Sequence, residues 1–409
     1  DFFWIAAIGL VVLTALYTIF GGMKSVLYTS VLQTPILLLG SLIILVLGFK
    51  ELGGWDEMMR VCGAVTVNDY GDTMTNLIRS NDDANFPWLG ALIGSAIIGF
   101  WYWCTDQFIV QRVLSGKNEM EARRGTIFGA YLKLLPVFLF LIPGMIAFAL
   151  HQKYIGAGGE GFLPMLANGT ANADAAFPTL VAKLLPAGVK GLVVCGILAA
   201  LMSSLASLFN SSAMLFTIDF YKRFRPETPE KKLVGIGQVA TVVIVILGIL
   251  WIPIMRSVGD VLYTYLQDVQ SVLAPGIAAA FLLGICWKRT SAQGGMWGLI
   301  AGMVIGLTRL GAKVYYSNAG EVADSTFKYL FYDMNWLFFC GWMFLFCIIV
   351  VIVVSLATKA PTAEKIQGLV FGTATKEQKA ATRASWNHWD IIHTVIILAI
   401  TGAFYWYFW

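Results

Sequence analysis

The sequence predicts an all-α membrane protein, a polytopic bundle of helices, and three observations support this fold class. Of the 409 residues, 58% are hydrophobic and only 13% are charged, and the mean hydropathy is +0.74. Apolar runs of the length that crosses a bilayer, about 20 residues, recur along the whole chain. The connections between these runs alternate between basic and acidic. This composition excludes a soluble globular domain.

About ten segments are long and apolar enough to span the hydrocarbon. They cover residues 3–20, 26–48, 88–114, 124–150, 186–219, 231–255, 260–286, 293–313, 335–357 and 388–409. Because the helices of such a bundle fold as one unit, we expect residues 1–409 to form a single transmembrane domain.

Lysine and arginine residues gather in every second connection between the predicted spans. The basic connections contain Lys24; Arg112, Lys117, Arg123 and Arg124; Lys222, Arg223, Arg225, Lys231 and Lys232; Lys288 and Arg289; and Lys359, Lys365, Lys376, Lys379 and Arg383. An excess of Lys and Arg marks cytoplasmic loops. We therefore expect both chain ends to lie on the outer side of the membrane. The membrane itself would be a plasma membrane or a bacterial inner membrane.

Three connections are long enough to hold structure of their own. The outer loop 49–87 is acidic and favours a short helix near residues 55–60. The outer loop 151–185 is rich in Gly and Ala and favours an amphipathic helix at 177–185. The inner loop 358–388 is basic and polar, and we expect it to lie along the membrane surface.

The chain carries no motif of an enzyme, a nucleotide-binding module or a nucleic-acid-binding module. It has no P-loop and no HExxH sequence, and His151, His388 and His393 lack the spacing of metal ligands. We therefore predict no catalysis, no cofactor and no nucleic-acid partner. Asn168 opens a glycosylation sequon, which has meaning only in a eukaryotic secretory route.

Charged residues inside the predicted spans are the most informative feature for function. Asp106 lies in span 88–114 and Lys133 in span 124–150. A charge at membrane depth costs at least about 2.5–3.5 kcal/mol, so it usually faces a partner or a wet cavity. Lys133 lies about 14 Å along the helix axis from Arg124, too deep for its side chain to reach the interface. It either forms an internal ion pair, for example with Asp106, or lines a polar site.

The span 186–219 carries a stripe of small polar residues on one helical face. The stripe consists of Ala200, Ser203, Ser204, Ser207 and Ser211. Sodium is a hard cation that prefers oxygen ligands, which hydroxyls and the carbonyls of a broken neighbouring helix can supply. Small residues also let membrane helices approach closely, so the pattern alone leaves both interpretations open.

Two other groups of polar and aromatic residues share helical faces. Tyr263 and Gln267 lie one turn apart, and an amide beside an aromatic ring suits a sugar, although amides also join helices. Pro275 with its neighbours should disturb the helix beyond them. Tyr102 and Trp103 continue the apolar run of their span without a turn signal and lie too deep for an interfacial aromatic belt.

These residues belong to longer motifs that resemble a known family. Trp101-Tyr102-Trp103-Cys104-Thr105-Asp106-Gln107, followed by Ile109-Val110-Gln111-Arg112, closely resembles the sodium/glucose cotransporter branch of the solute:sodium symporter family. Further similar motifs are Tyr131-Leu132-Lys133-Leu134, Leu201-Met202-Ser203-Ser204-Leu205, Phe216-Thr217-Ile218-Asp219-Phe220-Tyr221, and Phe281-Leu282-Leu283-Gly284 through Trp287-Lys288-Arg289. The resemblance covers essentially the whole chain.

The resemblance implies a LeuT-type fold of two inverted five-helix repeats that carries sodium and sugar together by alternating access. It gives Lys133 and Gln267 the role of sugar contacts, and places Trp103 under the sugar. Tyr102 would close the inner gate and Tyr263 would form the outer gate. We expect these groups, which come from separate helices, to converge on one watery chamber.

The resemblance also implies half of a sodium site, in which Ala200 supplies a backbone carbonyl and Ser203 and Ser204 supply hydroxyls. Sodium is then a coupling ion rather than a cofactor. Ser30 stands where many relatives have an aspartate near the ion exit. Gly99 stands where relatives have a Thr or Asn near the sugar, and Thr264 stands where animal members have an Asp. The identity of the sugar is therefore left open.

Family members have about fourteen spans, and the chain resembles the last ten. The part not represented would include the broken first core helix, so we expect the chain to be a fragment of a longer symporter. We predict a sodium-coupled importer of a hexose or of a polyol such as inositol. Three alternatives stay open: a related symporter for an amino acid, sialic acid, carboxylate or anion; a transporter-like sensor domain; and a channel.

Overall fold

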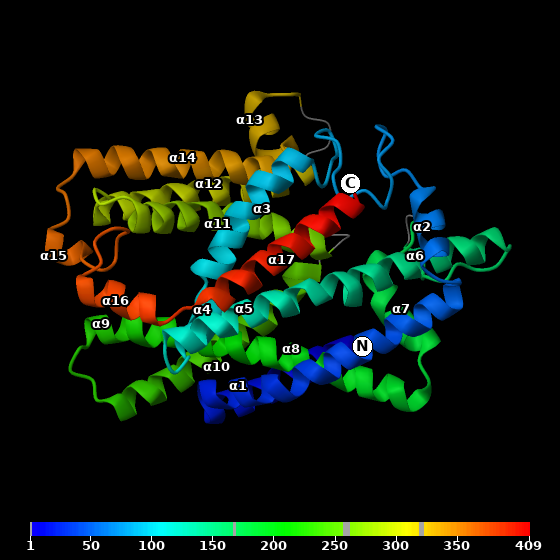
Figure 1. Ribbon diagram of the computed structural model, residues 1–409, viewed down its shortest axis with the longest axis horizontal. Helices are drawn as coiled ribbons and strands as arrows, with labels where there is room; N and C mark the ends of the chain where they lie inside the picture. The colour runs from blue at the N-terminus through cyan, green and yellow to red at the C-terminus, as the bar shows by residue number, and fades with distance from the viewer. Residues whose placement is uncertain (1, 167–168, 257–261, 319–322) are drawn as a thin grey trace. The chain divides into compact units, whose positions relative to one another are not determined.

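The computed structural model describes residues 2–166, 169–256, 262–318 and 323–409 (Figure 1). Helices dominate this part of the chain, and the β features found in it are isolated bridges. Eight of the described helices are long and apolar enough to cross a membrane, or nine if the bent pair α3 (Trp88–Cys104) and α4 (Gln107–Leu114) is one span. The predicted all-α membrane bundle is confirmed, whereas the count of ten spans stays a prediction. Asn168 of the sequon lies outside the described residues.

The first helix differs from the prediction. We expected two spans, 3–20 and 26–48, separated by a basic connection at Lys24, but α1 (Phe2–Leu52) is one helix of 51 residues. Its sequence explains the continuity, because its one proline is Pro35 and glycines weaken a helix by only about 1 kcal/mol each. Within α1, Gln33–Leu52 passes as a span and Trp4–Ile19 is a shorter apolar stretch. The side chains of Lys24 and Ser30 lie outside the described ones.

The helices pack as two compact units. Unit 1 comprises Asp1–Val65 and Leu132–Val261, and unit 2 comprises Thr66–Tyr131 and Leu262–Trp409. The division passes through α5 (Glu119–Pro136), whose last residues belong to unit 1. That residues 1–409 act as a single transporter domain stays a prediction.

Unit 1 is built on the long contact between α1 and α8. Besides α1 it contains α2 (Trp55–Gly63), η1 (Val137–Leu141), α6 (Ile142–Gly156), η2 (Ala173–Ala175), α7 (Ala176–Leu184), α8 (Ala187–Leu215), η3 (Phe216–Tyr221), α9 (Lys222–Phe224) and α10 (Glu230–Arg256). Glycines bring α1 and α8 together, because a Cβ atom on Gly40 would lie 2.7 Å from Cγ2 of Val193. Ala15, Phe209 and Val245 form a buried cluster where α1, α8 and α10 meet.

Unit 2 is built on three helices that run side by side, α11 (Leu262–Cys286), α12 (Ala292–Asn318) and α14 (Trp336–Ala357), with α3 packed on α11 and α14 (Figure 1). Smaller elements are α13 (Thr326–Lys328), η4 (Tyr329–Asp333), α15 (Ala363–Ile366) and α16 (Lys376–Ala384), and α17 (His388–Tyr407) ends the chain. The expected disturbance of α11 at Pro275 is wrong, because the helix continues to Cys286. Its neighbours hold it there: Ala274 and Ala278 are fully buried against α3 and α14.

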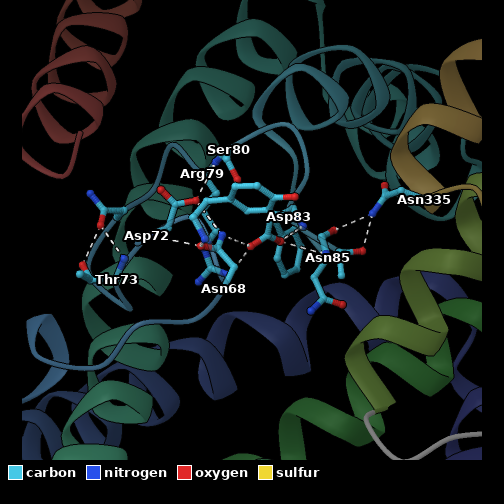
Figure 2. Close-up of polar contacts among 12 residues, drawn as sticks. Asn68, Asp72, Thr73, Arg79, Ser80, Asp83, Asn85 and Asn335 are labelled. Carbon is cyan, nitrogen blue, oxygen red and sulfur yellow. Dashed lines mark hydrogen bonds and ion pairs between the residues drawn. The ribbon is translucent and has the colours of Figure 1, made fainter.

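The helices predicted within the loops 49–87 and 151–185 are confirmed as α2 and α7. The remainder of the first loop is held by a network of polar side chains (Figure 2). The Asn68 amide donates to carboxylate oxygens of Asp72 at 2.7 Å and of Asp83 at 3.1 Å. The Asn335 amide, which precedes α14, donates to the Ala84 carbonyl at 2.7 Å. The loop is therefore an ordered part of unit 2.

Candidate functional site

The predicted sodium residues lie on α8, where the structure divides the polar stripe into two groups. Ala200 and Ser204 line a cavity of about 270 Å³ in unit 1, together with Leu37, Phe140, Phe177, Ile197 and Leu201. Ser203, only 8% exposed, is not among these lining residues, because neighbours on a helix point about 100° apart. The structure therefore brings Ala200 and Ser204 together at one cavity and places Ser203 in the packed interior.

The last two serines of the stripe, Ser207 and Ser211, have hydrogen-bond partners within their own helix. The Ser207 hydroxyl donates to the Ser203 carbonyl at 2.9 Å, and the Ser211 hydroxyl donates to the Ser207 carbonyl. Hydroxyls that bond back to the preceding turn are a common arrangement inside helices. These two serines thus fit the alternative interpretation, close helix packing, whereas Ser204 lines the cavity.

Lys133 is an exposed residue near the end of α5, one turn before Pro136. Proline has no N–H for the helical bond, and the helix widens directly after it into the π-helix η1. Such π-segments often occur at functional sites. Phe140 of η1 lines the same cavity as Ser204. Lys133 and the cavity are thus connected by one continuous, locally irregular helix of unit 1.

Asp106 has a role that the sequence analysis did not assign to it. The predicted span 88–114 is not one continuous helix, because α3 and α4 meet at a bend of 48°. Asp106 is the N-cap of α4, and its carboxylate accepts a hydrogen bond from the Phe108 N–H at 3.1 Å. The Thr105 hydroxyl donates to the Trp101 carbonyl at 2.7 Å, which satisfies the end of α3. The signal was present, since aspartate is a preferred N-cap residue.

Tyr102 and Trp103 lie in the last turn of α3, next to this bend. Their rings meet edge to face with centroids 5.2 Å apart, and Trp103 is 49% exposed. The exposed indole of Trp103 thus offers an apolar face beside the helix break. The predicted position of Trp103 under the sugar stays a prediction.

Tyr263 and Gln267 lie near the start of α11 in unit 2. Tyr263 is 57% exposed and Gln267 is half-buried. The next residue, Asp268, is buried on the packed side of the helix. The predicted common face of Tyr263 and Gln267 is therefore the more open face of α11. Since α3 packs on α11, the four aromatic and amide residues come from two neighbouring helices.

The eight predicted residues divide between the two units. Lys133, Ala200, Ser203 and Ser204 belong to unit 1, and Tyr102, Trp103, Tyr263 and Gln267 belong to unit 2. Convergence of both groups on one chamber stays a prediction.

A second cavity, of about 470 Å³, lies in unit 2 between α5 and α17. Among its lining residues are Arg124, Tyr131 and His393, and the Tyr131 hydroxyl lies 3.0 Å from Nδ1 of His393. None of the eight predicted residues lines it.

Three charged residues inside the predicted spans are not among the predicted site residues. Asp268 of α11 lies between Arg309 and Lys313 of α12. Arg309 is only 1% exposed. The rule that drew attention to Asp106 and Lys133, a charge within an apolar span, would have found them as well.

Comparisons with known proteins agree with this architecture. A family model described as the sodium:solute symporter family matches residues 3–302. A sodium/mannose cotransporter of Bos taurus is 35% identical over 99% of this chain and 72% of its own. Sodium/myo-inositol cotransporter 2 of Homo sapiens is 35% identical over 90% of this chain and 56% of its own. Sodium/glucose cotransporter 1 of Ovis aries is 38% identical over 87% of this chain and 56% of its own.

The chain thus spans little more than half the length of two of these three relatives. The fold also matches a solved structure, that of a Na+-coupled sialic acid symporter in a substrate-bound, outward-open state. The TM-score is 0.64 over 86% of this chain and 66% of the other, at 20% identity. At this identity the likeness shows the fold, and it confirms the predicted LeuT-type bundle.

Proposed function

Because the chain belongs to the sodium:solute symporter family, we propose that it takes part in moving a sugar or polyol across a membrane together with sodium. The resemblance to the sodium/glucose branch is confirmed, and the family is one of transporters rather than enzymes. The observation that carries the proposal is the match to three cotransporters over 87–99% of this chain. Mannose, myo-inositol and glucose, the solutes in their names, are all polyhydroxylated rings.

Sodium binds, in this proposal, at the cavity of unit 1 that Ala200 and Ser204 line. The Ala200 carbonyl and the Ser204 hydroxyl supply oxygen ligands of the kind that a hard cation prefers, and Ser203 contributes its hydroxyl from the buried side. The residues described around the cavity are all uncharged. A site of neutral oxygens suits a monovalent cation, because a divalent ion usually takes carboxylates.

The sugar binds between groups that can hydrogen-bond its hydroxyls and stack on its ring. The amide of Gln267 and the ammonium of Lys133 supply the hydrogen bonds, and the exposed indole of Trp103 supplies the stacking face. Tyr102 and Tyr263 close the two sides in turn. Sodium binding favours the outward-open state and so raises the affinity for sugar, which is coupling through differential affinity for two states. The membrane potential adds about 2.3 kcal/mol per charge per 100 mV.

Transport by reconstituted protein tests this proposal. Proteoliposomes that contain the protein should accumulate labelled glucose, mannose or myo-inositol when sodium is present outside. Replacing sodium with choline should abolish accumulation above the level of empty liposomes. Equal accumulation in both media would contradict sodium coupling.

A second candidate is a carboxylate such as sialic acid, because the solved structure with the matching fold is of a sialic acid symporter. Competition decides between the two. In the sugar proposal, unlabelled hexoses and inositol reduce uptake of the labelled sugar and sialic acid does not. Inhibition by sialic acid alone would favour the second candidate.

A further inference from the structure

An ion cluster in unit 2 joins α11 to its neighbours directly beside Gln267. The Lys313 ammonium donates to Oδ2 of Asp268, and Nη2 of Arg309 lies 3.6 Å from Oδ1 of the same carboxylate. Asp268 is 9% exposed and Arg309 is 1% exposed. Arg309 and Lys313 lie one turn apart on α12, so both reach the same point of α11.

Arg309 extends the cluster to a third element. Its Nη2 donates to the Met334 carbonyl at 2.8 Å, in the segment that leads into α14. Its guanidinium group also lies over the Phe339 ring of α14, with Cζ 4.0 Å from the ring centroid. One arginine therefore contacts α11, α12 and the start of α14, and Asp268 is the residue through which α11 takes part.

The desolvation of charged groups makes this cluster an unfavourable way merely to hold the three helices together. The Arg309 guanidinium and the Asp268 carboxylate are removed from solvent, whereas the Lys313 side chain stays 33% exposed, and the Nε and Nη1 atoms of Arg309 have no hydrogen-bond partner among the described residues. Apolar side chains of similar size would hold the three helices together without that desolvation. What an ion cluster adds is a fixed orientation of the helices that carry it, because the charged groups pair only when their partners lie at the right positions.

In this cluster, the ion pairs fix how α11 is rotated about its own axis. Asp268 follows Gln267 in sequence, and neighbouring residues point about 100° apart. With Asp268 held on the packed side, Gln267 and Tyr263 are held on the more open side. The Ser271 hydroxyl, which donates to the Asp268 carbonyl at 2.6 Å, supports the same turn of helix.

We propose that Asp268 is a positioning residue for solute recognition: its ion pairs with Arg309 and Lys313 set the rotation of α11 and so aim the Gln267 amide at the solute. The inference rests on the proposed function, in which Gln267 contacts the sugar. It assigns to three charged residues a part in recognition that they perform without touching the solute.

A double-mutant cycle separates positioning from general stability. Asp268→Asn should raise the apparent KM for sugar about tenfold. The half-saturating sodium concentration, measured at saturating sugar, should stay unchanged because the proposed sodium residues are not altered. In a Gln267→Ala background, Asp268→Asn should add little, because the amide that it aims is gone. Additive effects of the two substitutions would overturn the inference and leave the proposed function standing.

Further variants make the test robust. If Asp268→Asn alone does not fold, Asp268→Asn with Lys313→Gln restores the charge balance of the cluster, and its KM should still be raised about tenfold. Asp268→Glu keeps the carboxylate and should recover much of the affinity. The matched control is Asp324→Asn, which removes a carboxylate from an exposed pair with Lys328 at 2.9 Å, and its KM should stay unchanged. A normal KM both in Asp268→Asn and in Asp268→Asn with Lys313→Gln overturns the inference. An unchanged KM in Gln267→Ala alone overturns the proposed sugar contact as well as the inference.

Discussion

At the scale of single residues, the two adjacent serines of α8 show how far one step along a helix changes the surroundings of a side chain. Ser204 lines a cavity, and Ser203 is buried in the packed interior. Ser207 lies one turn further on the stripe, and its hydroxyl is already bonded to the Ser203 carbonyl. Residues of the same type on nominally one face therefore have different capacities to bind an ion.

This difference yields a prediction for sodium affinity. Ser204→Ala should raise the half-saturating sodium concentration of uptake about fivefold or more, because a ligand oxygen is lost at a site that has few others. Ser207→Ala is the matched control, and it should leave the sodium dependence unchanged because that hydroxyl serves its own helix. Sodium titrations of sugar uptake at saturating sugar measure both. Equal effects of the two substitutions would remove Ser204 from the proposed site.

Another residue-scale prediction concerns the cap at the bend between α3 and α4. Asp106→Ala removes the acceptor of the Phe108 N–H and should destabilise the start of α4 by about 1 kcal/mol. Asp106→Asn keeps an oxygen acceptor and should retain most of the stability. Thermal unfolding in detergent compares the two variants, and the same midpoint for both would contradict a capping role.

At the scale of elements, the loop between α2 and α3 depends on one buried carboxylate. Burial by itself would raise the pKa of Asp83, but hydrogen bonds from the Phe86 and Asn85 N–H groups and from the Asn68 amide, with the charge of Arg79, outweigh it and hold the pKa below its usual value. Asp83 therefore favours the folded loop when it is ionised (Figure 2).

The lowered pKa of Asp83 sets the sign of the pH dependence of stability. A carboxyl group whose pKa is lowered in the folded state contributes stability that is fully present above the unfolded value, about 3.9 for aspartate. That stability is lost as the pH falls through the lower, folded pKa. Thermal unfolding midpoints measured from pH 7 down to pH 3 should show this loss in the native protein.

Asp83→Asn should lower the free energy of unfolding of the loop at pH 7 by about 2 kcal/mol and reduce the loss at low pH. Asp82→Asn is the control, because Asp82 is an exposed neighbour, and this variant should behave as the native protein does. Limited proteolysis of the loop at pH 7 provides a second measure. A native pH profile in Asp83→Asn would contradict the role assigned to this carboxylate.

At the scale of the whole molecule, each unit holds together where small residues let helices touch. On α12, a Cβ atom on Gly298 would lie 2.3 Å from Cγ2 of Val351 in α14, and one on Gly302 would lie 2.9 Å from the Cα atom of Gly276 in α11. Such spacing of small residues is typical of helix contacts within a membrane. The packing of unit 2 thus depends on positions where no side chain fits.

Gly298→Ala should therefore lower the stability of the protein by about 1–3 kcal/mol through overpacking. Gly295→Ala is a matched control in the same helix, because a Cβ atom there meets nothing within 4 Å, and it should be neutral or stabilising by up to about 1 kcal/mol. Thermal unfolding in detergent measures both. Equal midpoints would show that the contact of α12 with α14 tolerates a methyl group.

The sequence by itself determined the membrane class, nearly all the spans and the family, because these depend on local quantities: the length of apolar runs, the charges between them and short motifs. It also placed Tyr263 and Gln267 on one face, since helical periodicity is local. Only the tertiary structure decided which serine lines a cavity, that Asp106 caps a second helix after a bend, that α1 continues past residue 20, and that Asp268 meets Arg309 and Lys313. The physical reason is that exposure, capping and ion pairing depend on which segments, distant in sequence, come to lie beside a residue.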